Sequence, residues 1–198
     1  MVTLEPNQKT IVRFLSELTR GWDSSETLEI RCIREHYKPH SSRFALHAFD
    51  EAVEHIIAMN RTHNMYVCVN PVPDKTIGSA KDNDIERSFF AFVDGDEFGA
   101  AERARSCDWF DISMEVVTGT KPYLRNHVYF RFKNPIEDMR QWTELQKLLI
   151  GHLKTDRVVH NPSRIMRCAG TVTYPPKKKI DLGYKSEVTK LIIGGHYA

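Results

Sequence analysis

Apolar residues recur along this chain at two periods, and the change of period divides the first half into helices and strands. After Pro6, apolar side chains follow helical spacing and predict an amphipathic N-terminal helix; they are Ile11, Val12, Phe14, Leu15, Leu18 and Trp22. Alternation with a period of two predicts strands over residues 26–33, 43–49 and 64–71. Asp50 is placed to cap a helix whose apolar face comprises Ala52, Val53, Ile56 and Ile57.

The second half opens with a polar stretch over residues 72–88, whose turn residues predict a long surface loop. The apolar run FFAFV (89–93) then predicts a buried strand that is too hydrophobic to lie at the edge of a sheet. A short helix is expected over 98–106, and the basic stretch PPKKK (175–179) predicts a loop. Further strands are expected over 114–119, 126–132 and 187–193.

The strongest helix signal begins at Asn134, an N-cap candidate that precedes Pro135 at the first helical position. Glu137 is placed to complete a capping box. An apolar stripe follows, which we interpret as core packing: Ile136, Met139, Trp142, Leu145, Leu148, Leu149 and Leu153. Because strands and helices mix without strict alternation, we predict an α+β fold with a mostly antiparallel sheet.

Composition narrows the class of protein. The 198 residues suit one domain of generous size or two small ones, and 41% hydrophobic and 27% charged residues are typical of a soluble globular protein. The net charge is only +2, so any basic surface must be local. No apolar run approaches the roughly 18–20 residues of a membrane span, and no signal peptide opens the chain. We therefore expect a cytoplasmic protein without a membrane partner.

The cysteines and the end of the chain add two expectations. The four cysteines form no CxxC pair, so reduced core thiols are expected rather than a zinc site. The chain stops soon after the apolar segment in LIIGGHYA. We expect a single domain over residues 1–198, and a domain cut from a longer protein is one interpretation.

Two aspartates, Asp94 and Asp96, follow the strand 89–93 with one glycine between them. Residues two apart on a strand point to the same face, so both carboxylates can be presented together. Like charges at the end of a buried strand repel each other and resist desolvation. The DGD sequence also suits a solvated turn. The functional alternative is that Mg²⁺ or Mn²⁺ offsets the repulsion.

Cationic groups follow in an order that suits phosphates. Arg125 and His127 lie two apart at the start of a strand, so both can face the same way. Asp156 comes after the long helix. Bases follow it at Arg164, Arg167 and the lysines 177–179. Each residue alone has a plain structural explanation, but acids followed by bases are the groups that a metal-bound nucleoside triphosphate requires.

The order of these motifs resembles the archaeo-eukaryotic primase superfamily, and most closely the primase-polymerases of phages, plasmids and mobile elements (the PrimPol and RepB-like group). VDGDEFG is similar to their first motif and RNHVYFRF to their second. DRVVHNPSRIMRCAGTVTYP is similar to their third, in which NPSRIMRCAGT is the most specific stretch. TLEIRCI, MYVCVNP and TGTKPYLR also resemble segments of these proteins, so the resemblance covers roughly residues 26–195.

The resemblance implies a two-part α+β fold with an RNA-recognition-motif-like catalytic half, in a protein of a bacterial, archaeal or phage-infected cell. It also implies template-directed nucleotidyl transfer from nucleoside triphosphates by a two-metal mechanism, with a single-stranded or primed DNA template and a helicase domain or protein as partners. Asp94, Asp96 and Asp156 would bind the catalytic Mg²⁺ or Mn²⁺. His127 would contact the phosphates of the incoming nucleotide, assisted by Arg167, Arg125, Arg164 and Lys177.

Two features depart from this family's pattern. Arg125 stands where many relatives have the serine of Ser-x-His, and the zinc-binding cysteines of some relatives are absent. Two other functions are compatible with part of the pattern. A non-catalytic module that binds single-stranded nucleic acid would explain the lysines but not the paired aspartates. A glycosyltransferase that holds a nucleotide-sugar through Mn²⁺ would explain the DxD motif but not the later Asp and Arg residues, so we predict a primase-polymerase.

Overall fold

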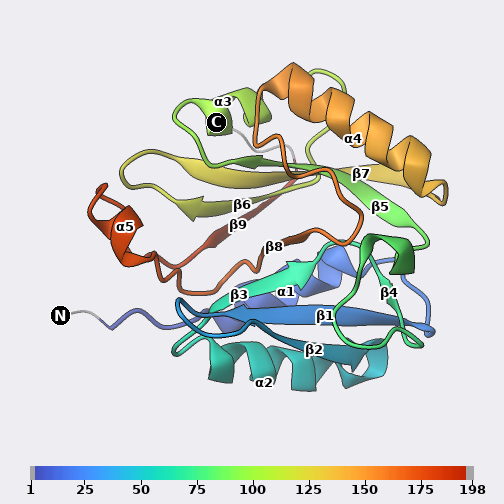
Figure 1. Cartoon of the computed structure of the whole chain (residues 1–198), viewed down its shortest axis with the longest axis horizontal. Helices are drawn as coiled ribbons and strands as arrows, with labels where there is room; N and C mark the ends of the chain where they lie inside the picture. Colours follow the sequence, from blue (N-terminus) through green and yellow to red (C-terminus); the bar gives the residue numbers. More distant parts are fainter. Residues whose placement is uncertain (1–2, 195–198) are drawn as a thin grey trace.

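Two antiparallel β-sheets, one in each half of the molecule, form the computed structural model, which describes residues 3–194 (Figure 1). The first sheet has the order β2-β1-β3-β8, with β4 paired to β1. Its strands are β1 (Glu26–Ile33), β2 (His40–Ala45), β3 (Asn64–Cys68), β4 (Val72–Pro73) and β8 (Ile165–Arg167). The second sheet has the order β5-β7-β6-β9. Its strands are β5 (Ser88–Gly95), β6 (Met114–Gly119), β7 (Arg125–Ile136) and β9 (Lys190–Ile193).

Helices cover these sheets in the α+β arrangement predicted from the sequence. They are α1 (Gln8–Leu18), α2 (Phe49–Met59), α3 (Ala100–Arg105), α4 (Met139–Leu153) and α5 (Lys177–Ile180), with 3₁₀ turns at Leu46–Ala48 and Asp82–Asp84. In Figure 1, α2 lies below the first sheet, and α3 and α4 lie above the second. The second half runs β5-α3-β6-β7-α4 and is completed by β9, which is a β-α-β-β-α-β succession. No described helix is long and apolar enough to cross a membrane.

One hydrophobic core runs through both halves. It includes Ile30 and Val67 of the first sheet, and Phe130 of the second, all completely buried. Helix α1 contributes Phe14, whose ring packs edge-on against Tyr129 of β7 with the centroids 6.2 Å apart. The chain itself also crosses between the halves: after α4 it forms β8 in the first sheet and then β9 in the second.

Strand β5 lies at the edge of its sheet, so the expectation of a central strand over 89–93 was wrong. Its free side is closed by side chains of α4 instead of another strand. The indole Nε1 of Trp142 donates to the carbonyl oxygen of Phe90 at 2.8 Å. The Gln146 amide binds both backbone groups of Phe92, accepting from its N–H at 3.3 Å and donating to its C=O. A helix can therefore bury an edge strand that composition alone would place in the centre.

The predicted start of the long helix at Asn134 was also wrong. Strand β7 continues through this stretch, and Ile136 pairs with Ser88 of β5. The helix begins at Met139, where the Asp138 carboxylate accepts hydrogen bonds from the amides two and three residues on. Tertiary pairing thus outweighs the local capping signals of the Asn-Pro-Ile-Glu stretch.

Smaller differences concern element boundaries. Strand β2 covers residues 40–45 rather than 43–49, and Asp50 lies in the first turn of α2 instead of capping it, because the helix begins at Phe49. The loop expected over 72–88 contains the short strand β4 and a 3₁₀ turn. The loop expected over 175–179 contains the start of α5. All four cysteines are free thiols, and three of them are buried.

The closure of β5 can be tested with Gln146→Ala, which leaves the N–H and C=O of Phe92 without their side-chain partner in the interior. Each unpaired buried group costs about 1–3 kcal/mol, so we expect the free energy of unfolding to fall by about 2–4 kcal/mol in urea denaturation. Lys147→Ala, on the exposed side of the same helix, should change it by no more than about 0.5 kcal/mol. Equal effects of the two substitutions would contradict the role given to Gln146.

Candidate active site

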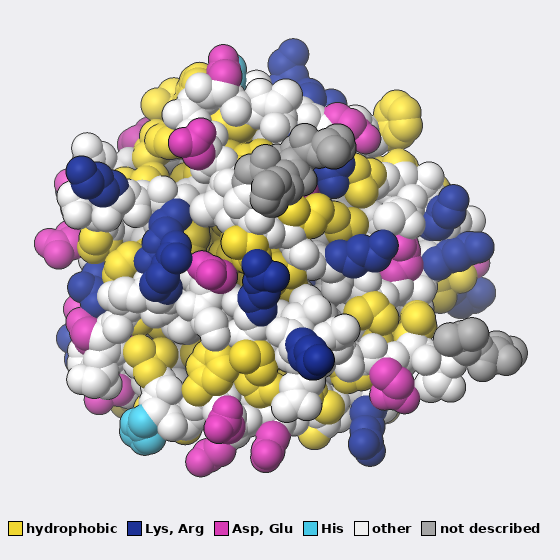
Figure 2. All heavy atoms as spheres, turned by 180° about the vertical axis from the view of Figure 1, so that it is seen from behind, with side chains coloured by type: hydrophobic (Ala, Val, Ile, Leu, Met, Phe, Trp, Pro, Cys, Tyr) yellow, Lys and Arg dark blue, Asp and Glu magenta, His cyan; other side chains and the backbone are white. Residues whose placement is uncertain are grey.

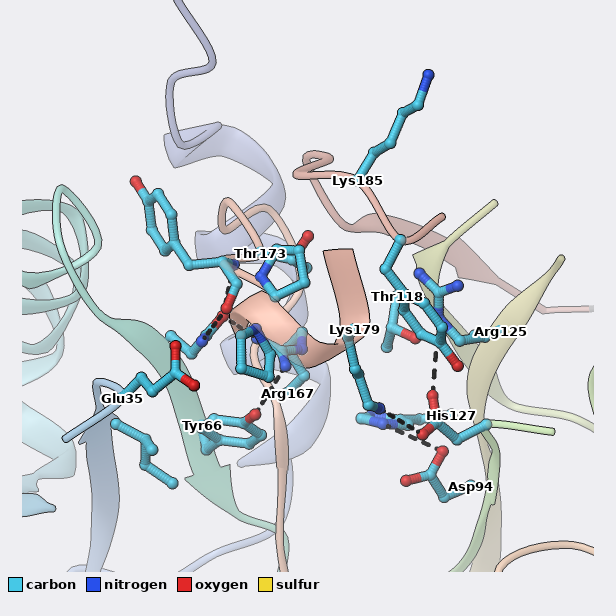
Figure 3. A pocket seen from close by; sticks show the side chains of 17 residues that line it. Glu35, Tyr66, Asp94, Thr118, Arg125, His127, Arg167, Thr173, Lys179 and Lys185 are labelled. Carbon is cyan, nitrogen blue, oxygen red and sulfur yellow. Dashed lines mark hydrogen bonds and ion pairs between the residues drawn. The ribbon is translucent and has the colours of Figure 1, made fainter. Parts of the chain in front are cut away.

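A cleft of about 400 Å³ opens between the two halves beside α5, and acidic and basic side chains both line it (Figure 3). The second half contributes two aspartates, a histidine and Arg125, while the first half and the α5 segment contribute Arg167, Lys179, aromatic rings and one acid, Glu35. The lining residues include Asp94, Asp96, His127, Tyr66, Arg167 and Lys179.

Asp94 and Asp96 enter the cleft at the end of β5. Asp94 is the next-to-last residue of the strand, and Asp96 is the first residue after the strand. The side chain of Asp94 is 22% exposed and that of Asp96 is 41% exposed, so both are accessible to a ligand. The residue between them can only be glycine. A Cβ at Gly95 would lie 2.5 Å from Oδ1 of Asn126 and 2.9 Å from the backbone of Ala101 in α3. The close packing of α3 on β5 therefore explains the DGD spacing.

The third predicted acid, Asp156, lies directly beside the first. Its backbone N–H donates to the carbonyl oxygen of Asp94 at 3.0 Å, which continues the closure of the free edge of β5. Its Oδ1 accepts from the backbone N–H of Val158 at 3.0 Å, which fixes the turn after α4. Asp156 is not among the residues that line the cleft, although it is close enough for its charge to raise the pKa of Asp94.

Burial shifts the pKa values of Asp94 and His127 in opposite directions. Burial, followed by the negative charges of Asp96 and Asp156, raises the pKa of the Asp94 carboxyl to about 7. His127 faces Asp94 across the β5–β7 pair, with 3.7 Å between Nε2 and Oδ1. Burial and the nearby Arg167 lower the pKa of His127 to about 3, so its imidazole is neutral at pH 7. Within the described residues, its buried Nδ1 has no hydrogen-bond partner.

Asp96 is held by two cations. The Nζ of Lys179 lies 2.9 Å from its Oδ2, and the Nε of Arg125 lies 3.7 Å from its Oδ1. The guanidinium of Arg125 also stacks on the ring of Tyr184, 4.2 Å from its centroid, and donates to the carbonyl oxygen of Lys121. Arg125 is therefore a buried support for this wall, whereas Lys179 reaches in from α5.

Arg167 forms the opposite wall. It pairs with Tyr66 in the β3–β8 register, and its guanidinium donates to the Tyr66 hydroxyl at 2.7 Å. It also donates to Oδ1 of Asn64 at 2.6 Å, which orients the planar group. In Figure 3, Arg167 and Tyr66 lie across the cleft from Asp94 and His127.

Two predicted nucleotide-binding residues lie elsewhere. The side chain of Arg164 donates to the carbonyl oxygen of Val158, outside the cleft lining. Lys177 is exposed and lies 3.6 Å from Asp181, while Lys179 of the same helix lines the cleft. A lysine run does not indicate which member points inward until the helix is known. Tyr66 was also missed, because in the sequence it is only a residue of an apolar strand.

The acids suit a divalent cation, although they are not already grouped as a metal site. Within residues 3–194, no three His, Cys, Asp or Glu side chains form a ready-made metal-binding group. Hard carboxylate oxygens are nevertheless the donors that Mg²⁺ and Mn²⁺ prefer. The raised pKa of Asp94 reflects its burial and, after that, the nearby charges of Asp96 and Asp156, which a cation would offset; Lys179 already places one positive charge on Asp96.

The raised pKa of Asp94 makes stability depend on pH. The pKa of about 7 in the folded protein exceeds the ordinary value of 3.8 for aspartate, so the folded state binds the proton more tightly and loses stability as pH rises from about 4 through 7. We expect the free energy of unfolding of Asp94→Asn, relative to that of the wild type, to increase by on the order of 2–4 kcal/mol between pH 4 and pH 8. Urea denaturation of both proteins in EDTA measures this difference, and a constant difference across that range would contradict the assigned charge.

Comparisons with known proteins show that this chain shares its fold with solved structures. We found no match among protein-family models or among curated protein sequences. The archaeo-eukaryotic primase domain of the cyanophage S-2L primase-polymerase (PrimPol) is similar over 98% of this chain and 94% of its own, with a TM-score of 0.67 and 22% identity.

The primase RepB′ is similar over 93% of this chain and 56% of its own, with a TM-score of 0.61 and 11% identity. Its catalytic domain in complex with initiator DNA is similar over 90% of this chain and 85% of its own, with a TM-score of 0.55 and 12% identity. The chain therefore has the archaeo-eukaryotic primase fold, in the form found in phage and plasmid primase-polymerases.

Proposed function

We propose that this protein catalyses template-directed nucleotidyl transfer, as a DNA primase or polymerase that uses nucleoside triphosphates. One observation carries the proposal: Asp94 and Asp96 enter the cleft at the end of β5 beside His127, with the backbone of Asp156 bound to that of Asp94, and Arg167 and Lys179 reach the same cleft. A transferred nucleotide needs both kinds of group, because its triphosphate is anionic and its metal is cationic. The fold shared with primase-polymerases supports the same reaction class.

Asp94, Asp96 and Asp156 would hold Mg²⁺ or Mn²⁺ in this proposal. The bound metal would supply activation of the attacking 3′-hydroxyl and neutralisation of charge on the triphosphate and the leaving pyrophosphate. The protein's own contribution is to hold these carboxylates at one strand end. A backbone hydrogen bond joins Asp156 to Asp94, so the main chain at the two acids is held together.

His127, Arg167 and Lys179 would orient the triphosphate. His127 is neutral, and its imidazole therefore carries one N–H that can donate a hydrogen bond to a phosphate oxygen in the cleft. Arg167 is already oriented by Tyr66 and therefore loses little freedom on binding. Lys179 is free to leave Asp96 for a phosphate when a cation takes its place. Arg125 supports the wall, and Arg164 and Lys177 have no assigned contact.

The acids can be tested with Asp96→Asn and Asp156→Asn in an assay of labelled nucleotide incorporation on a primed DNA template with Mg²⁺ or Mn²⁺. Both should lose at least about 99% of the wild-type rate, because a neutral amide does not replace the charge of a metal-binding carboxylate. Mn²⁺ should raise the melting temperature of the wild type and not of either variant, by mass action. An active Asp156→Asn protein would remove Asp156 from the proposed site, and a wild type without incorporation would contradict the function.

The two lysines of α5 provide a matched pair. Lys179→Ala should raise the KM for the nucleoside triphosphate by about tenfold or more, because a charge-assisted contact to phosphate contributes on the order of 1.5–3 kcal/mol. Lys177→Ala changes the same charge on the same helix but faces away from the cleft, so its KM should stay within about twofold of the wild type. Steady-state kinetics at saturating template measure both, and equal effects would show that α5 acts only through its general charge.

A further inference from the structure

The hairpin that connects β1 to β2 carries a local excess of positive charge. Residues 34–43 (REHYKPHSSR) contain Arg34, Lys38 and Arg43 together with two histidines, and only one acid, Glu35. The whole chain has a net charge of only +2. On the face shown in Figure 2, basic and acidic side chains are interspersed. The hairpin is therefore more positively charged than the protein as a whole.

These residues line an open groove on the first half of the molecule. The groove lies between the hairpin and the loop at Gly78 and Ser79, and the hydroxyls of Ser41 and Ser79 meet at 2.7 Å and join the two. Lys38, His40 and Arg43 line it, and no carboxylate does. Among the described residues, Nη1 of Arg43 is shielded from solvent and has no hydrogen-bond partner. The groove thus gathers donors and positive charge without a counter-charge in its walls, which suits phosphate groups.

An exposed aromatic ring stands at the tip of the same hairpin. Tyr37 is 60% exposed, and the guanidinium of Arg34 lies 4.5 Å from the centre of its ring. A cation on one face of the ring restrains its orientation. An exposed, oriented aromatic ring beside a row of cations is the combination with which proteins hold single-stranded nucleic acid, because the ring stacks on an unpaired base while the cations follow the phosphates.

The hairpin also joins the groove to the candidate active site. Ile33 and Glu35 line the cleft, while Lys38 and the residues after it line the groove. Only His36 and Tyr37 separate, along the chain, the residues that line the two surfaces.

We propose that this groove binds the phosphates of a single DNA strand, with Tyr37 stacked on one of its bases, and that it leads the template into the cleft. The direction of the strand toward the cleft rests on the proposed function. The binding of a single strand rests on the groove itself, through its charge, its lack of acids and its aromatic tip. Duplex DNA would use the cations but not the ring, because its bases are already stacked.

The test measures binding of a fluorescein-labelled oligo-dT of about 15 nucleotides to the whole chain by anisotropy. EDTA is present and nucleotide is omitted, so the metal site does not contribute. Lys38→Glu should weaken binding at least about fivefold and reduce the slope of log K against log salt by about 0.7 or more. Tyr37→Ala should weaken it about 5- to 100-fold with an unchanged slope, because it removes stacking and not a phosphate contact, and Tyr37→Phe should restore it.

Lys147→Glu on α4 makes the same charge change on an exposed residue of the other half and should leave affinity within about twofold. Melting temperatures of all variants check that each is folded. Unchanged affinity of Lys38→Glu and Tyr37→Ala would overturn the proposal, and so would a loss no larger than that of Lys147→Glu. A duplex that binds as tightly as the single strand, together with a silent Tyr37→Ala, would also overturn it.

The outcome is separable from that of the proposed function. If the wild type incorporates nucleotides while both groove variants bind DNA normally, only the groove assignment fails. If the variants lose single-strand affinity as expected while the wild type shows no incorporation with either metal, the groove stands and the polymerase function fails.

Discussion

The free edge of β5 is the constraint on which the site depends. An edge strand with five consecutive apolar residues must hide its unpaired peptide groups from water and from other chains. Here the side chains of Trp142 and Gln146 form hydrogen bonds with backbone groups of residues 90 and 92, and the backbone N–H of Asp156 donates to the carbonyl oxygen of residue 94. The interaction that stabilises the strand therefore also delivers an acid, some sixty residues along the chain, to the side of Asp94.

Electrostatics then shapes the cleft around this strand end. Burial and the charges of Asp96 and Asp156 raise the cost of ionising Asp94, and the molecule compensates with Lys179 on Asp96 and with Arg167 on the facing wall. The aromatic partners Tyr66 and Tyr184 hold two guanidinium groups in fixed planes. The result is a cleft in which acidic and basic side chains are held in fixed positions, which lowers the cost of ordering a ligand that carries both signs.

Motif order predicted the fold class and most of the cleft, because His127, Arg167 and the DGD sequence are each fixed by a strand. What failed depended on tertiary partners. The edge position of β5 could not be predicted, because the groups that cover it are on α4. The helix start at Asn134 gave way to pairing of Ile136 with Ser88. The inward-facing lysine could not be chosen among three neighbours without knowing that residues 177–180 are helical, and Tyr66 has no signal apart from its partner Arg167.

The shared core has a consequence for how the cleft admits its ligand. Arg167 on one wall lies only eleven residues after Asp156, whose backbone binds that of Asp94 on the other wall, and Phe14 packs across the junction onto Tyr129. Two halves tied in this way cannot swing apart as independent lobes without opening their common interior. Discrimination between ligands must therefore come from the fixed width and chemistry of the cleft and from the rotation of single side chains such as Lys179, and not from a closing motion of domains.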